Sequence, residues 1–245
     1  MITKSEHYKR MIKYWNSQVK VSSVSKNESQ IINKILEVIH KRKCKNILEI
    51  GCGSAQDTII IAQKSGSKIT CVDFSPEMIK KAKIHIKKEG LEKQINFILD
   101  NILDIKLKEN FFDGVIAKSI LHHLFSKNDI RLVCKNIFRS LKPKGIFILV
   151  ENWANPNPSK YETLAFQLSQ KARKLKGIKE VFLNKDEYLE VLKKIGFSNI
   201  EWAFIPERIE LNRYALNEIL KVDVEKTKLN FPRGRIKNLF IIATK

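Results

Sequence analysis

The feature that most constrains the fold is a repeated alternation of short apolar runs with amphipathic stretches, which extends from residue 45 to residue 150. Short runs rich in Ile and Val are each followed by a loop and then by a longer amphipathic stretch. Runs this short are typical of buried parallel strands rather than helices. Strands that alternate with helices predict an α/β fold with helices on both faces of the sheet. The five predicted strands are Asn46–Ile50, Lys68–Val72, Ile95–Leu99, Gly114–Ala117 and Gly145–Val150.

Local signals mark where the intervening helices begin and end. Ser75 followed by Pro76 is typical of a helix start, and Gly90 is placed to end that helix. Ser126 with Asp129 is typical of a capping box, and Pro143 is expected to stop the helix that follows. Apolar spacing predicts further helices within residues 6–18, 31–39, 161–175 and 185–195, and two late strands at 200–205 and 237–244.

These elements predict one Rossmann-like domain over residues 1–245. Its sheet would have seven strands, mostly parallel, with an antiparallel last strand and helices on both faces. The core that binds the cofactor is expected at residues 43–151. Helical caps at residues 1–42 and 152–185 are expected over the open end of the sheet, and residues 186–245 would add a last helix and strands. The length of 245 residues suits such a domain.

Composition narrows the classes to which the chain can belong. Its 46 Lys and Arg against 26 Asp and Glu give a net charge of +20, but the lysines are spread along the chain and Arg is sparse, which disfavours nucleic-acid binding. No apolar run is long enough to span a bilayer, and the polar N-terminus predicts no secretory signal. The four cysteines form no CxxC pair, so a cytoplasmic protein without a zinc ribbon is expected.

The stretch from Ile47 to Asp57 carries the strongest chemical signal. An apolar strand runs into Gly51 and Gly53 and then into a helix. Glycines let the backbone turn sharply and approach a ligand, which also meets the helix N-terminus. Asp73 ends the next strand, where a carboxylate can bind both hydroxyls of a ribose. Together these features predict a cofactor that contains adenosine.

Two departures from a dinucleotide fingerprint indicate which cofactor this is. The third glycine of that fingerprint is missing, since the loop continues with Ala55 and Gln56. Glu49 precedes the loop, and its carboxylate would repel a diphosphate. The charge therefore favours a cationic or zwitterionic ligand, and S-adenosylmethionine, which carries a sulfonium and an ammonium group, fits this description.

Five stretches resemble, in order, the motifs of class I S-adenosylmethionine-dependent methyltransferases: ILEIGCGSA, CVDFSPEMIKKAK, FILDNILD, FDGVIAKSILHHL and LKPKGIFILVE. They cover residues 46–151, and the later KKIGFSNIEW is also similar. The chain is most similar to the small-molecule branch that includes quinone-biosynthesis methyltransferases. The resemblance implies methyl transfer by in-line displacement to an N, O or C atom of a small metabolite, with S-adenosyl-L-homocysteine as product.

The resemblance also implies a set of cofactor-binding residues. Those for the methionine end are Glu49, Gly51, Cys52, Gly53 and Ser54, with Asp57 at the start of the next helix. Those for the nucleoside are Asp73 at the ribose, with Phe74, Met78, Asp100, Asn101 and Ile102 around the adenine. Lys118 and Ser119 are expected beside the sulfonium. Ala55 departs from the family pattern, where many members carry another glycine.

The candidate catalytic residues are His123, as a general base near neutral pH, and Glu151, as an acid or substrate anchor. A purely structural role is the alternative for each. Adjacent histidines do not point at one metal in most backbone conformations, so no metal site is expected. An aromatic lid would exclude water from the methyl donor. The predicted substrate and cap residues are Tyr8, Tyr14, Trp15, His122, Trp153 and Tyr161.

Several alternatives stay open. Cys52 is interpreted as a small packed residue rather than a nucleophile, and Asp100 could merely cap a turn with Asn101. The positive charge favours an RNA methyltransferase, but no Asn-Pro-Pro-Tyr-like element follows the fourth strand. A catalytically silent scaffold and an NAD-dependent oxidoreductase are the remaining candidates, the latter disfavoured by Glu49 and Gln56. The sequence predicts neither the methyl acceptor nor the oligomeric state.

Overall fold

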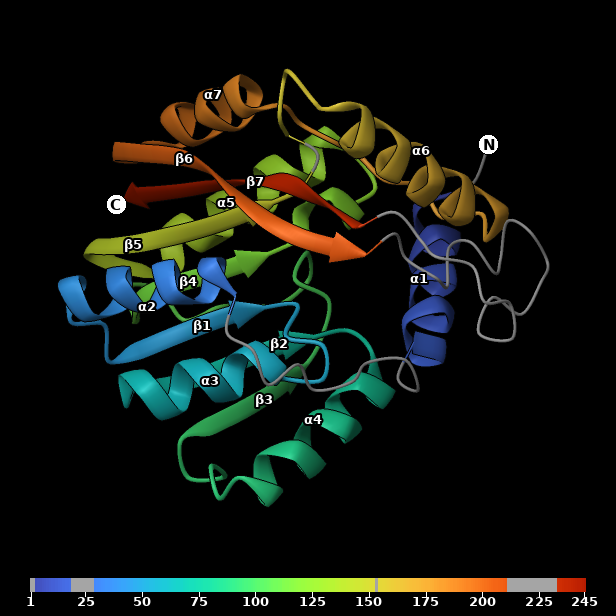
Figure 1. Ribbon diagram of the computed structural model, residues 1–245. Coiled ribbons are helices and arrows are strands. Elements are labelled where there is room, and N and C mark those ends of the chain that lie inside the picture. Colours follow the sequence, from blue (N-terminus) through green and yellow to red (C-terminus); the bar gives the residue numbers. More distant parts are fainter. Residues whose placement is uncertain (1–2, 19–28, 153, 211–232) are drawn as a thin grey trace.

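The computed structural model of the chain describes residues 3–18, 29–152, 154–210 and 233–245. Their strands form one sheet in the order β3-β2-β1-β4-β5-β7-β6 (Figure 1). Strands β1 to β5 pair in parallel, and β7 is antiparallel to both of its neighbours, as the sequence predicted. The strands are β1 (Asn46–Ile50), β2 (Lys68–Asp73), β3 (Ile95–Leu99), β4 (Phe112–Lys118), β5 (Leu141–Glu151), β6 (Ser198–Glu210) and β7 (Arg233–Thr244).

The helices begin where the sequence signals place them. Ser75 Oγ accepts a hydrogen bond from the Met78 N–H at 3.2 Å and so caps the helix that starts at Pro76. Gly196, in the left-handed conformation, ends the helix that starts at Lys185. The helices are α1 (Lys4–Gln18), α2 (Gln30–Arg42), α3 (Gln56–Ser65), α4 (Pro76–Lys88), α5 (Lys127–Ser140), α6 (Lys160–Leu175) and α7 (Lys185–Ile195), with a 3-10 turn η1 (Leu121–His123).

Two boundary predictions differ in detail from the structure. Ser126 caps the Asp129 N–H, but the Asp129 carboxylate pairs with Lys4 of α1 at 2.6 Å, so it does not complete a capping box. Pro143 follows the end of α5 at Ser140, as predicted, but it lies inside β5, which begins at Leu141 and not at Gly145. The β4–β5 pairing shifts register just there, between Phe112 and Gly114, and this irregularity accommodates a residue without an N–H donor.

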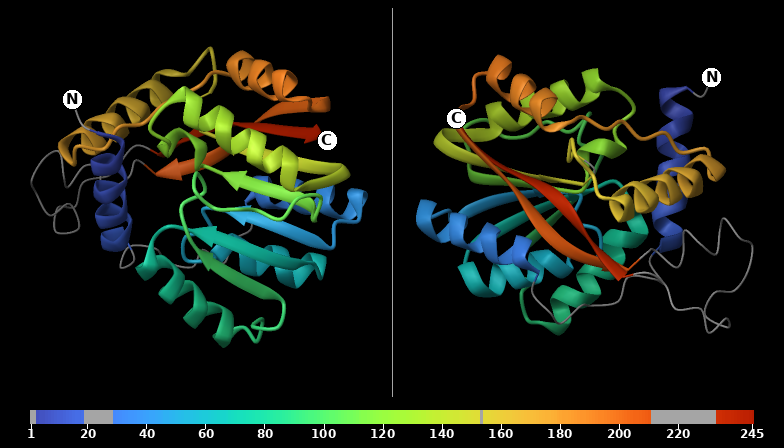
Figure 2. Two further views of the ribbon diagram at one scale, coloured as in Figure 1. Left: turned by 180° about the vertical axis from the view of Figure 1, so that it is seen from behind. Right: turned by 45° about the horizontal axis from the view of Figure 1, so that its top comes forward.

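The alternation of side chains along the strands divides the core into two layers. On one face Ile47 and Ile116 pack with residues of α2, α3 and α4. On the other face Leu48 and Val115 pack with residues of α5 and α7. Figure 2 shows these two groups of helices on opposite faces of the sheet. Both layers are buried, which explains why the strands are apolar throughout rather than alternating in polarity.

The two N-terminal helices lie in different places. Helices α1 and α6 lie beyond the carboxyl ends of the parallel strands, as the predicted cap requires (Figure 1). Helix α2 instead packs on a face of the sheet beside α3, burying Ile31, Ile35 and Ile39. Its apolar stripe is wide enough to belong to the core, so the cap comprises α1 and not the whole of residues 1–42.

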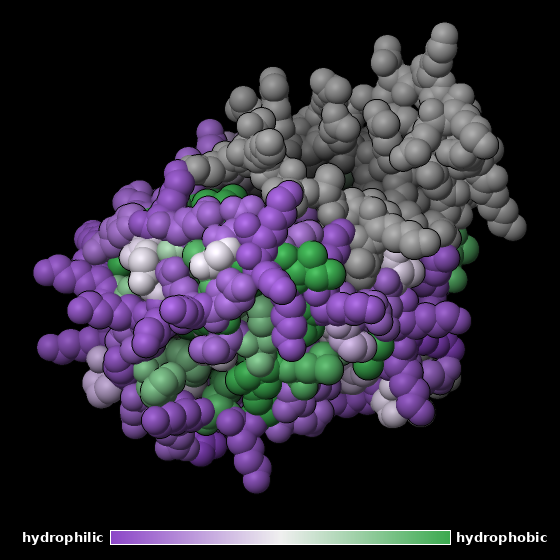
Figure 3. Space-filling view, turned by 90° about the horizontal axis from the view of Figure 1, so that it is seen from below, coloured by the Kyte–Doolittle hydropathy of each residue, from purple (hydrophilic) through white to green (hydrophobic). Residues whose placement is uncertain are grey.

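The β3 edge carries exposed apolar residues. Seen from the side of β3 and α4, apolar surface lies among hydrophilic side chains (Figure 3). Ile84 of α4 and Ile98 and Leu99 of β3 are exposed there.

Among the helices of the described residues, none has both the length and the apolar character required to cross a membrane.

Candidate active site

A cavity of about 330 Å³ opens at the carboxyl ends of β1, β2 and β4. This volume lies in the range of small-molecule sites. Parallel strands bring their carboxyl ends to the same edge, so loops far apart in sequence meet there. The lining residues are Trp15, Gly51, Cys52, Gly53, Ser54, Gln56, Asp57, Asp73, Phe74, Met78, Lys118, Ser119, Ile120 and His123.

The glycine loop after β1 forms the floor of this cavity. Gly51 and Gly53 have φ angles of +72° and +54°, which favour glycine over residues with a side chain. A Cβ on Gly51 would lie 2.6 Å from Ile120 Cδ1, whereas a Cβ on Gly53 would meet no atom within 4 Å. Gly51 is therefore required for packing, and Gly53 leaves open space beside the backbone for a ligand.

Asp73 fixes the shape of the loop from the end of β2. Its Oδ2 accepts the Gly53 N–H at 2.8 Å, and its Oδ1 accepts the Ser75 N–H at 2.9 Å. Burial raises the pKa of Asp73, and the backbone donors act against this rise. Each carboxylate oxygen keeps a second lone pair that can accept a ribose hydroxyl.

Two acidic residues and a lysine, Glu49, Asp57 and Lys118, are predicted near the methionine end or the sulfonium of the expected cofactor. Burial raises the pKa of Glu49 to about 7, although Thr58 Oγ1 donates a hydrogen bond to Oε2 at 2.5 Å. Glu49 lies behind the loop and is not among the lining residues. Asp57 pairs with Lys118 at 3.1 Å, which joins the start of α3 to the end of β4.

Cys52 and Ser54 both line the cavity. A hydrogen bond with Cys71 and burial raise the pKa of the Cys52 thiol well above its ordinary value. A thiol held in its protonated form is a poor nucleophile, which agrees with the interpretation of Cys52 as a packed residue. The carbonyl oxygen of Ser54 lies 3.0 Å from His85 Nδ1, so α4 holds this part of the loop.

The three residues assigned to the adenine after β3 do not line the cavity. Asp100 is exposed and its Oδ1 accepts the Asn101 N–H, and Asn101 Oδ1 accepts the Leu103 N–H. These are turn-forming contacts. Ile102 is buried in the core layer of α5 and α7. Phe74 and Met78 line the cavity from the β2–α4 side.

The two candidate catalytic residues have different surroundings. His123 is buried and lines the cavity. Burial lowers the pKa of His123 to about 3, with His122 acting in the same direction and Glu180 against it, so the ring is neutral. Glu151 is 1% exposed and does not line the cavity. Its oxygens accept the N–H groups of Ile120 and Leu121 and lie 2.6 Å from His122 Nδ1.

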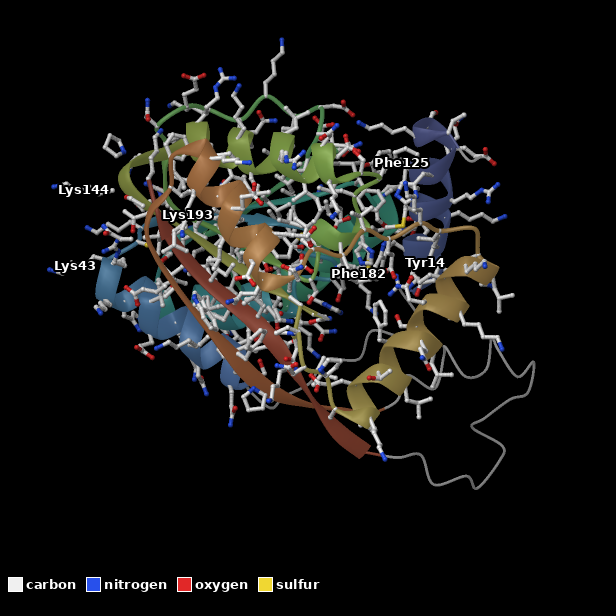
Figure 4. All side chains as sticks on the ribbon, turned by 90° about the horizontal axis from the view of Figure 1, so that it is seen from above. Tyr14, Lys43, Phe125, Lys144, Phe182 and Lys193 are labelled. Carbon is white, nitrogen blue, oxygen red and sulfur yellow. The ribbon has the colours of Figure 1, made fainter. Side chains whose placement is uncertain are left out.

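One aromatic side chain of α1 lines the site and packs against its neighbours. Trp15 lines the cavity, and its ring lies edge-on to those of Tyr14 and His123. Figure 4 shows Tyr14, Phe125 and Phe182 together near α1 and α6, far from Lys43 and Lys144. Of the other predicted cap residues, Tyr8 and Tyr161 do not line the cavity: Tyr8 Oη accepts the Phe125 N–H, and Tyr161 lies in α6. Trp153 falls outside the described residues.

Several residues of the site were missed by sequence reasoning. Gln56 and Ile120 line the cavity, and their neighbours in the glycine loop and in the motif after β4 could have indicated them. His7 was not expected near the other histidines, yet its Nε2 lies 3.0 Å from the carbonyl oxygen of His123. Arg173 and Glu180 meet at 3.1 Å beside His123. No periodicity or motif marks these last three residues.

The family model described as a methyltransferase domain matches residues 41–196. The chain belongs to this methyltransferase family. The resemblance to class I enzymes predicted from the sequence is thereby confirmed. The matched range includes the glycine loop, Asp73 and His123, and therefore most of the cavity lining.

Three individual relatives have low sequence identity to the chain, between 16% and 24%. A 24-methylenesterol C-methyltransferase of rice is 24% identical over 170 residues, which cover 67% of this chain and 44% of that protein. A protein of Bacillus halodurans C-125 with an unconfirmed methyltransferase assignment superposes with a TM-score of 0.69 at 16% identity, covering 87% of this chain and 98% of that one. The Haemonchus contortus phosphoethanolamine N-methyltransferase 2, solved with S-adenosylmethionine, gives 0.59 at 19% identity, covering 86% and 52%.

These comparisons establish family and fold. The chain spans between about a third and two thirds of the length of the first three curated relatives it matches, at 44%, 32% and 64%. The solved structures share less than 25% of their residues with it and so support the fold alone.

Proposed function

We propose that the protein transfers a methyl group from S-adenosylmethionine to an N, O or C atom of a small-molecule metabolite. The observation that carries the proposal is the cavity at the strand ends, which is lined by the glycine loop and Asp73 and also by Trp15 and His123. The glycine loop and Asp73 suit a nucleoside cofactor, and His123 is a neutral base that lines the same cavity.

The residues present fit this cofactor. The open space beside Gly53 lets the ligand approach the backbone, and Asp73 offers lone pairs to the ribose. Phe74 and Met78 provide apolar surface for the adenine. Asp100 is proposed to turn toward the adenine amino group, since its present contact is only with the neighbouring N–H. Lys118 and Ser119 lie where β4 ends, beside the proposed position of the sulfonium.

When bound, S-adenosylmethionine supplies an activated methyl group. The protein then has to align the two reactants and exclude water, which can contribute about 7–11 kcal/mol without a protein nucleophile. Trp15 of α1, which lines the cavity and packs edge-on against Tyr14, is proposed to exclude water from the site. His123 is proposed to take the proton of an acceptor that arrives protonated. Glu151 is proposed to hold the loop that carries His123, since its oxygens are engaged by that loop.

Binding and label transfer test this function directly. We expect S-adenosylmethionine and S-adenosylhomocysteine to bind the purified chain in calorimetry. With methyl-labelled S-adenosylmethionine and separate pools of metabolites and RNA, label should enter the metabolite pool. Label in RNA would indicate the RNA methyltransferase alternative, and absence of binding would indicate a silent scaffold.

The variant His123→Ala separates binding from transfer. We expect its affinity for S-adenosylhomocysteine to stay near that of the wild type, since the glycine loop and Asp73 are untouched. Transfer into the metabolite pool should fall at least about tenfold, the low end for a lost general base. Unchanged transfer would show that His123 is structural.

A further inference from the structure

A buried carboxylate behind His123 has no role in the function proposed above. Glu180 lies in the loop between α6 and α7, and its side chain is 2% exposed. Its Oε1 lies 3.1 Å from His123 Nδ1 and 3.1 Å from Arg173 Nη1. Its Oε2 accepts a hydrogen bond from Gln170 at 2.7 Å. A buried carboxylate with this many partners is held in one position.

The cation that balances this carboxylate is already present in the protein. His122, His123 and Glu180 bring potential metal-ligand atoms within 4.8 Å of one another, since the two adjacent rings lie side by side at 4.0 Å. The sequence argument that such rings diverge therefore does not describe this geometry. Arg173, however, contacts the same Glu180 oxygen. Its guanidinium supplies the positive charge there, and a divalent cation would be repelled by it.

The position of His123 is determined from several sides. His7 contacts the backbone carbonyl of His123. The ring of His123 lies 5.3 Å from the ring of Trp15. The backbone N–H of Val181, next to Glu180, donates to the carbonyl of His122 at 2.8 Å. The loop that carries Glu180 is thus tied directly to the turn that carries His123.

The contact between His123 and Glu180 has the distance of a hydrogen bond but not yet its alignment. The buried Nδ1 has no aligned partner among the described residues, although Glu180 Oε1 is 3.1 Å away. Catalytic hydrogen bonds are often poorly aligned before ligands bind and tighten in the complex. With Nδ1 facing Glu180, Nε2 is the nitrogen left for the cavity that His123 lines.

We infer that Glu180 is a positioning residue for methyl transfer, holding His123 in the tautomer that carries its proton on Nδ1. Nε2 then presents its lone pair to the acceptor. This inference rests on the proposed function. As the acceptor atom bonds to the methyl carbon, its proton passes to Nε2, and the electrons of the broken carbon–sulfur bond stay on sulfur. His123 gains one proton, which Glu180 stabilises and which later leaves to water.

The arrangement agrees with the charges around the site. Burial alone would raise the pKa of Glu180, but His123 and Arg173 bring it down to about 2, so the carboxylate remains ionised. A fixed anion beside Nδ1 favours a proton on that atom and also stabilises the imidazolium that forms during transfer. Burial, His122 and Arg173 together lower the pKa of His123 to about 3, so the ring is neutral at the start, and Glu180 is the group that acts against them when the proton arrives.

The inference is tested by measuring which tautomer His123 adopts. The measurement uses 15N NMR on protein labelled at histidine, with S-adenosylhomocysteine added at saturating concentration. His123→Ala identifies the signal. We expect the Nδ1–H tautomer in the wild type and a shift toward Nε2–H in Glu180→Ala. The double variant Glu180→Leu with Arg173→Met removes both charges of the pair and is used if the single variant does not fold.

The matched control is Glu187→Ala, which removes a carboxylate that caps α7 on the other side of the same loop. It should leave the tautomer unchanged. Nε2–H in the wild type, or an unchanged tautomer without Glu180, would overturn the inference. Binding of S-adenosylhomocysteine is measured on the same samples, so a failure of the proposed function is seen separately. With an acceptor identified, Glu180→Ala should lower kcat at least about tenfold and leave KM for S-adenosylmethionine unchanged.

Discussion

Replacement of Glu151 by Ala should destabilise the protein more than any surface change of the same kind. The carboxylate is 1% exposed and accepts the Leu121 N–H at 2.7 Å and the Ile120 N–H at 3.2 Å, with His122 Nδ1 at 2.6 Å. Each donor left unsatisfied in the interior costs about 1–3 kcal/mol. Because the loop can relax in part, we expect a loss of about 3–5 kcal/mol, the cost of breaking a buried pair.

Urea unfolding of the wild type and variants measures this loss through the midpoint and the slope. The control is Glu109→Ala, which removes a carboxylate paired with Arg139 on the surface, where about 1 kcal/mol or less is expected. Glu151→Gln keeps one acceptor oxygen and should fall between these variants. A loss below about 1 kcal/mol for Glu151→Ala would refute the view that this carboxylate anchors the loop after β4.

Three further predictions follow from the geometry of the glycine loop. Asp73→Ala should weaken the binding of S-adenosylhomocysteine by about 1–3 kcal/mol, or about 5- to 150-fold in calorimetry, and equal affinity would rule out a ribose contact. Gly51→Ala should lower the thermal midpoint of unfolding more than Gly53→Ala, because only a Cβ at position 51 would meet Ile120. Gly53→Ala should instead weaken ligand binding. A lower thermal midpoint for Gly53→Ala than for Gly51→Ala would contradict the packing argument. Burial raises the pKa of Glu49 from 4.5 to about 7, so the folded state binds a proton more tightly than the unfolded state. Stability should therefore fall as the pH rises from about 4.5 to 7, by about 3 kcal/mol at most, and Glu49→Gln should lack this fall when unfolding is followed across that range.

Local patterns determined most of the fold and part of the site. The strand Asn46–Ile50 has the bounds that its composition predicted, because a parallel strand covered on both faces is rich in apolar residues. The strand Ile95–Leu99 also has the predicted bounds, although it forms the edge of the sheet and exposes Ile98 and Leu99. The glycine loop and Asp73 were also predictable, since residues that end neighbouring parallel strands share one edge of the sheet. The order of these features along the chain was enough to place the cavity.

Tertiary structure alone decided which residues surround His123. His7 of α1 and Glu180 of the loop before α7 contact His123, and Arg173 of α6 contacts Glu180. Each of the three lies at least 50 residues from His123 in the sequence. Such contacts leave no periodic trace, because a polar side chain that is buried by another element resembles an exposed one in the sequence. The same applies to Glu151, whose partners depend on how the chain turns after β4. A residue's type sets the chemistry it can perform, whereas packing between distant segments sets which atoms it faces.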